Sequence, residues 1–176
     1  MSGRPARARL GGVHSDLDNL LVTFNEGTDL ACVLVSASYL DDALAQLLEG
    51  YLIRGKTSTR LLETDGAIGG MGVRADVAYS LGLLSKPHYC NCRTVAEVRN
   101  LFAHTHKPLG FTDEPALSAV RRLQLPSLQG GDPDGIIARM AEDPRAHYTM
   151  VAAALCTQVL NLGLTVERRC SPEARW

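Results

Sequence analysis

Apolar residues recur at intervals of three and four along residues 29–49, the spacing that gives a helix one buried face. Thr28 or Asp29 can cap the start of this helix, and Gly50 can help to end it. The stretch is therefore predicted to be a long amphipathic helix. Its apolar positions are Leu30, Val33, Leu34, Ala37, Leu40, Leu44, Leu47 and Leu48.

The same periodicity predicts further helices, and convincing strand alternation is absent from the sequence. An earlier helix is expected around His14–Phe24, and another follows the glycine-rich segment 66–72, with an apolar stripe of Val73, Val77, Leu81 and Leu84. The remaining expected helices cover residues 88–104, 112–123, 134–142 and 144–162. The sequence thus predicts an all-α fold, a single helical domain of about six or seven helices.

The ends of the chain lack this pattern. Residues 1–12 carry three arginines and no apolar period, so we expect a flexible basic arm there. A single helical domain is expected over residues 13–165, followed by a flexible tail over residues 166–176. With 176 residues, the chain is long enough for one domain with a substantial core.

The net charge and the cysteine content narrow the classes of protein to which this chain can belong. The formal net charge is −1, so a strongly basic DNA-binding domain is not indicated. Five cysteines are an odd number and no secretory signal opens the chain, which predicts a reduced, cytoplasmic protein. No apolar run reaches the length of a membrane span, so no membrane association is expected.

The segment AEVRNLFAHTHKP, residues 96–108, holds the most suggestive group of side chains. At 100° per residue, Val95, Val98 and Phe102 share a core-facing stripe. Arg93, Glu97, Asn100 and His104 share the opposite face.

On that helix, Arg99 and His104 lie about 140° and ~7.5 Å of rise apart, so an ideal helix would not aim both at one atom. Loosening of the helix before Pro108, or a symmetric dimer that pairs two copies, could bring them together.

These residue types permit acid–base chemistry on a phosphate. A histidine can move protons at neutral pH, and an arginine can hold a phosphate through two hydrogen bonds. In RNA cleavage His104 could deprotonate a 2′-hydroxyl while Arg99 holds the phosphate, without a metal. The alternative is an exposed helix face on which Arg93 pairs with Glu97, and His104 interacts with the helix C-terminus.

Other polar groups are weaker candidates. Asp41 and Asp42 are expected to bond to Arg74 or Arg99, because Arg74 opposes its helix dipole and needs a carboxylate partner. His106 is a secondary site residue.

Neither of two further motifs indicates a ligand site. Cys90-x-Cys92 does not have zinc-module spacing, and one of these cysteines is expected in the core, so no metal site is expected. GAIGGMG lacks the ending of a phosphate-binding loop, and its glycines are expected to supply positive-φ turns.

Several stretches resemble the mannitol operon repressor family in order and spacing, across residues 20–125. They are FNEGTDLACVLVSASYLDDALAQLL (24–48), GVRADVAYSLGLLS (72–85) and VRNLFAH (98–104). The matching features are Asp29, Leu40-Asp41-Asp42, Arg74, Ala78-Tyr79, Leu81-Gly82-Leu83, Arg99-Asn100 and Phe102-Ala103-His104.

RNLFAH also resembles the R-N-x-x-x-H pattern of HEPN domains, which are small helical dimers that include metal-independent ribonucleases. That resemblance implies a HEPN-like helical bundle, with Arg99 and His104 in catalytic positions and Asn100 as their polar neighbour. Glu97 departs from the basic residue expected just before this motif.

Two hypotheses follow from the sequence. The first is a transcriptional regulator that acts as a homodimer through a partner protein or operator DNA, with Arg74, Asp41, Asp42, Arg93 and His106 as binding residues. The second is a metal-independent endoribonuclease that acts on RNA through Arg99, His104 and Asn100. Neither requires a cofactor, and none is expected; whether the chain is an enzyme stays open.

Overall fold

A computed structural model of the chain describes residues 22–105, 108–125 and 135–170. Within these ranges the regular structure is entirely helical, as predicted. The helices are α2 (Asp29–Tyr51), α3 (Lys56–Leu62), α4 (Met71–Ser80), α5 (Lys86–His104), α6 (Ala116–Val120), α7 (Ile136–Glu142) and α8 (Pro144–Thr165). A short helical segment at residues 22–26 precedes α2. The predicted arm and residues 171–176 of the tail lie outside the described residues.

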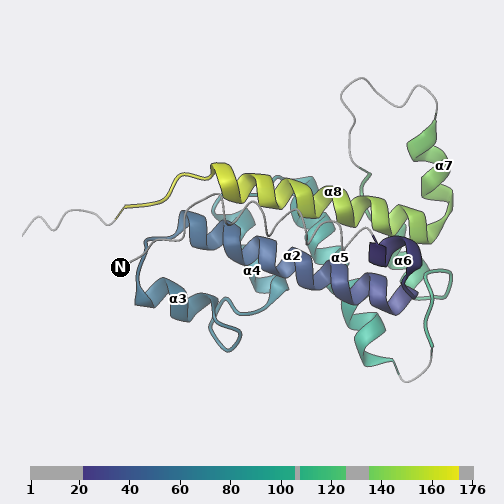
Figure 1. Ribbon diagram of the computed structural model, residues 1–176, viewed down its shortest axis with the longest axis horizontal. Helices are drawn as coiled ribbons and strands as arrows, with labels where there is room; N and C mark the ends of the chain where they lie inside the picture. Colours follow the sequence, from purple (N-terminus) through teal and green to yellow (C-terminus); the bar gives the residue numbers. More distant parts are fainter. Residues whose placement is uncertain (1–21, 106–107, 126–134, 171–176) are drawn as a thin grey trace, which may run out of the picture.

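Helices α2 and α8 form the centre of the bundle and lie side by side along its long axis (Figure 1). They run in the same direction, because Arg145 at the start of α8 contacts Asp29 at the start of α2, while Arg169 beyond the end of α8 contacts Tyr51 at the end of α2. α4 and α5 pack on α2 as well, and α6 packs on α5 and α8. α2 thus contributes to most of the core.

The termini of the long helices have the caps that their sequences specify. The Thr28 hydroxyl accepts from Ala31 N at the start of α2, and Ser85 does the same for His88 N at the start of α5. Asp143 accepts from the backbone N–H groups of Arg145 and Ala146 at the start of α8. The predicted boundaries of these three helices are correct to within three residues.

Helices α2 and α8 are also, by length and composition alone, long and apolar enough to cross a membrane. In this fold each packs its apolar face on the other and on the neighbouring helices. Both are therefore accounted for as the core helices of a folded domain.

Helix α4 is rotated relative to the prediction. Val73 and Leu81 are 45% and 40% exposed, and the helix instead buries Arg74, Ala75 and Ala78. The predicted apolar stripe is therefore wrong at Val73 and Leu81, whereas Val77 packs against the core and Leu84, beyond the helix, is buried. The physical reason is that small alanines allow close packing on the neighbouring helices and Arg74 reaches a carboxylate on α2.

In the segment 66–72, glycine is needed because the backbone passes close to other backbone atoms, and not because the backbone has a positive φ. A Cβ at Gly66 would lie 2.3 Å from the Arg60 carbonyl oxygen, and one at Gly69 would lie 2.3 Å from that of Thr64. Among the described residues, the glycines with positive φ are Gly82 and Gly135, so the expectation of positive-φ turns in this segment is wrong.

Two other expectations differ from the structure. Residues 112–123 hold only the five-residue α6, because turns occupy the residues on either side of it. α3 was not expected, since none of its residues is buried and the sequence there has no apolar period.

At the tail, residues 166–170 are described and lie against the end of α2, with Arg169 N donating to the Tyr51 carbonyl at 2.8 Å.

Candidate functional site

A large open groove follows the exposed side of α5. Its volume is about 1940 Å³, and we call it the α5 groove. α5 contributes residues from Tyr89 to His104, α2 contributes Leu34, Ala37, Ser38 and Asp41, and the 108–124 region contributes the remaining side, with Gly69–Gly72 at the start of α4 also lining it. The groove is thus built by four separate parts of the chain.

The α5 groove brings together most of the residues singled out from the sequence. Arg93, Arg99, Asn100, His104 and Asp41 all line it. The core stripe predicted for α5 is confirmed, because Val95, Val98 and Phe102 are buried. The polar face of this helix therefore forms the surface of the groove.

Two predicted residues lie elsewhere. Arg74 is 6% exposed and is not part of the groove surface. Asp42 is likewise not among the lining residues, and His106 lies outside the described residues.

Arg74 joins two of the segments that line the groove. Its guanidinium pairs with Asp41 at 2.6 Å, and it donates to the carbonyls of Ile68 at 3.0 Å and Leu62 at 2.8 Å. The pairing of Asp41 with Arg74 is among those expected from the sequence. Because these contacts use the guanidinium in three directions, Arg74 fixes the loop before α4 against α2.

Charged residues on α5 pair with neighbouring segments and not with each other. Arg93 pairs with Asp76 of α4 at 3.3 Å, and Glu97 pairs with Arg122 at 2.5 Å. The alternative prediction of an Arg93–Glu97 pair is therefore wrong. All four side chains are about half exposed, so these pairs orient the groove surface more than they stabilise the fold.

Arg99 and His104 both line the groove, but no hydrogen bond joins them among the described residues. Arg99 donates to Asn100 Oδ1 at 3.1 Å. α5 remains a regular α-helix through His104, so loosening of the helix does not bring the two together. Of the two routes considered from the sequence, only a second copy of the chain remains.

The described residues provide no group of histidine, cysteine and carboxylate side chains suited to a metal ion. Cys92 is fully buried, and burial raises the pKa of its thiol to about 12. Cys90 is half-buried and lines the groove. The expectation that one of the two cysteines faces the core is confirmed.

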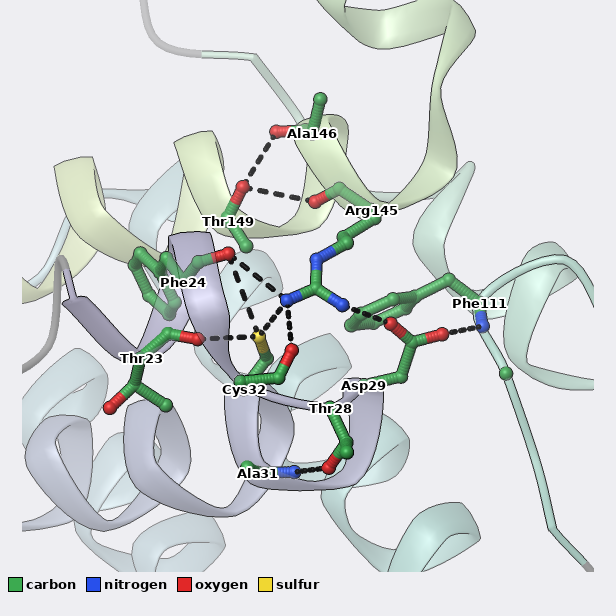
Figure 2. A network of polar contacts seen from close by, with 12 residues as sticks. Thr23, Phe24, Thr28, Asp29, Ala31, Cys32, Phe111, Arg145, Ala146 and Thr149 are labelled. Atoms are coloured by element: carbon green, nitrogen blue, oxygen red, sulfur yellow. Dashed lines mark hydrogen bonds and ion pairs between the residues drawn. The ribbon is translucent and has the colours of Figure 1, made fainter.

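A second polar cluster, which the sequence analysis did not anticipate, joins the starts of α2 and α8. The Arg145 guanidinium donates to Asp29 at 2.6 Å and to the Phe24 carbonyl at 3.1 Å (Figure 2). It also donates to the Gly27 carbonyl. The other Asp29 oxygen accepts from Phe111 N at 3.0 Å. We call this the Arg145 junction.

The Arg145 junction also surrounds a thiol. The Cys32 sulfur lies 3.1 Å from Arg145 and donates to the Thr23 carbonyl at 3.3 Å (Figure 2). Burial raises the pKa of Cys32, and the nearby arginine opposes that shift. The junction is thus saturated with internal partners, which assigns it a structural role.

Other groove residues were missed because their position depends on tertiary packing. Leu34 and Arg122 belong to predicted helices, but no local signal showed that they would face α5. For Arg145 a signal existed, since an arginine in the first turn of a helix opposes the dipole and needs a partner.

Comparison with known proteins identifies the fold. No protein-family model matches this chain, and no curated protein matches it. A solved structure does: the X-ray structure of the MtlR–HPr complex from Escherichia coli contains a chain with 20% identity and a TM-score of 0.62. The similarity covers 83% of this chain and 99% of that chain. This chain therefore has an MtlR-like fold.

Proposed function

We propose that this chain is a non-enzymatic regulator that acts by binding a protein partner through the α5 groove. The observation that carries the proposal is the similarity over 99% of a chain from the MtlR–HPr complex. MtlR is a mannitol operon repressor, the family that the sequence also resembles. The groove supplies the large, mixed apolar and charged surface that partner binding requires.

HPr is the partner named for that neighbour, which makes it the first partner to test here. We expect HPr from the organism that encodes this chain to form a saturable complex in isothermal titration calorimetry. Protein interfaces of ordinary size bind with dissociation constants from about micromolar to picomolar. Absence of binding at concentrations well above that range would remove HPr from the proposal.

The regulatory part of the proposal has its own test in cells. Deletion of the gene should change the transcript level of a neighbouring operon while leaving bulk RNA intact. Complementation with the intact chain should restore the level. If purified chain also shifts the neighbouring promoter DNA at low salt, the regulator contacts its operator directly; if not, a partner mediates the effect.

The second candidate function, a metal-independent endoribonuclease, is favoured by one observation: Arg99, Asn100 and His104 line the same groove. Because one copy does not pair Arg99 with His104, this reaction would require a second copy. Purified chain would have to cleave RNA without metal between about pH 6 and pH 8, and His104→Ala would have to abolish cleavage. Intact RNA under these conditions would contradict this second function.

The assembly expected from the sequence also stays a proposal. We propose a cytoplasmic homodimer, whose mass would be seen by sedimentation equilibrium over a range of concentrations. A single species with the mass of one 19.0 kDa chain would contradict it.

A further inference from the structure

The α5 groove is long and large enough to hold one helix. The lining residues of α5 run from Tyr89 to His104, which is about 22 Å at 1.5 Å per residue. A helix of that length and about 10 Å in diameter fills on the order of 1,700 Å³, and the groove has a volume of about 1940 Å³. The groove therefore has room for an occupant of roughly fifteen helical residues.

The charges of the groove specify what such a helix would carry. Arg93, Glu97 and Asp41 each have an oppositely charged partner on a neighbouring element. Arg99, in contrast, donates to the neutral amide of Asn100, so its charge is not balanced by a carboxylate among the described residues. A bound helix would complement the groove by presenting a carboxylate near Arg99.

Two acidic residues of the 108–124 region also line the groove. Asp113 accepts from Gly110 N and Glu114 accepts from Ser118 N, and these backbone contacts leave both negative charges uncompensated by a cation among the described residues. A lysine or arginine on the occupant would complement these two charges.

Apolar residues also line the groove. Leu34 of α2 is 39% exposed, and Leu101 and Leu109 are half-buried; all three line the groove. We propose that the α5 groove binds an amphipathic helix of a protein partner, with apolar residues on Leu34 and Leu101, a carboxylate at Arg99 and a basic residue toward Asp113 and Glu114. This inference rests on the proposed function, because it specifies the part of the partner that the groove binds.

Photocrosslinking in cells tests the nature of the occupant. The full chain would carry p-benzoylphenylalanine at Thr94, in the groove, or at Thr157, an exposed position of α8 outside it. We expect Thr94 to crosslink to a helical segment of another protein that carries an acidic residue, identified by mass spectrometry. A crosslink to a non-helical segment, to a second copy of this chain, or to nothing beyond what position 157 yields would overturn the proposal.

Charge reversal tests the role of Arg99. Arg99→Glu should lower the Thr94 crosslinking yield by about threefold to tenfold, as expected for reversing one exposed interfacial charge. Arg121→Glu is the matched control, because Arg121 is exposed but does not line the groove. Equal yields for Arg99→Glu and the control would contradict the assignment of a carboxylate to Arg99.

The two proposals can fail separately. If HPr binds in calorimetry but the Thr94 crosslink does not reach a helix, the regulator remains and the helical occupant is wrong. If HPr does not bind but Thr94 crosslinks to an acidic helix of another protein, the occupant is confirmed and HPr is excluded as the partner.

Discussion

His147 is a buried polar side chain whose charge depends on pH. It is 7% exposed, and its Nε2 bonds to the Leu123 carbonyl at 3.1 Å. Burial lowers its pKa below the ordinary 6.5, because the charged imidazolium is poorly solvated there. The neutral ring with a proton on Nε2 is the form that donates this hydrogen bond.

The sign of the pH effect follows from this shift. Below about pH 6.5 the unfolded chain protonates His147 while the folded chain resists protonation. The contribution of neutral His147 to the free energy of unfolding is therefore fully present above pH 6.5. It is lost as the pH falls toward the lower pKa that His147 has in the folded chain. We expect His147→Gln to flatten this part of the stability profile, measured by urea unfolding between about pH 5 and pH 7. If the stability profiles of the original chain and of His147→Gln ran parallel over this pH range, His147 would not be the source of the pH dependence.

At the scale of elements, the Arg145 junction fixes the starts of two long helices to each other. Replacing Arg145 with Met keeps most of the stem but leaves the Asp29 carboxylate without its cation. Because both side chains are only about 70% buried, we expect a loss of about 2–3 kcal/mol in the free energy of unfolding. Chemical denaturation followed by circular dichroism measures it.

A matched control for this change is Arg139→Met on α7, where the arginine is exposed. Its effect should stay within about 0.5 kcal/mol. The double variant with Asp29→Asn should be less destabilised than the sum of the two single variants, because the pair is then removed as a unit. Strict additivity would mean that the ion pair contributes nothing.

Helix α4 gives a second prediction at this scale. Ala78 is fully buried, so Ala78→Val should overpack the core and cost about 1–3 kcal/mol. Val73 is exposed, so Val73→Ser should change stability by no more than about 0.5 kcal/mol. Thermal unfolding of the two variants distinguishes the observed orientation of α4 from the one that its apolar pattern predicts, which would reverse the order.

The comparison of sequence with structure shows what periodicity can and cannot resolve. The core stripe of α5 and most of that of α2 were predicted correctly, because their large apolar residues face the core; Leu30 and Leu34 of the predicted α2 stripe are exposed instead. α4 was misoriented, since its buried side consists of alanines and one arginine, which a search for large apolar residues passes over. α3 gave no signal, because a helix without buried residues has no stripe.

For the candidate site, the sequence identified the polar face of α5 but not what lies opposite it. Arg99, Asn100 and His104 were recognised from their spacing and their resemblance to a known motif. Leu34 and Asp113 belong to distant segments, and only the packing of α2 and α6 on α5 brings them to the same groove.

At the scale of the whole molecule, stability is unevenly distributed. The centres of α2 and α8 hold residues with no exposed surface, whereas α3 has no buried residue. Amide hydrogen exchange should therefore be slowest in α2 and α8 and at similar rates in both, because both open only when the domain unfolds. Exchange in α3 should be faster by orders of magnitude. Equal protection of α3 and α2, seen by mass spectrometry, would contradict this view of a core with a lightly attached helix.

The parallel pairing of α2 and α8 has a consequence for synthesis on the ribosome. The contact between Asp29 and Arg145 joins residues 116 positions apart. At about 5–20 residues per second, α2 emerges roughly 6–23 s before its main packing partner is made. During that interval its leucine-rich face has no α8 to cover it, and the nascent chain offers the kind of surface that chaperones bind.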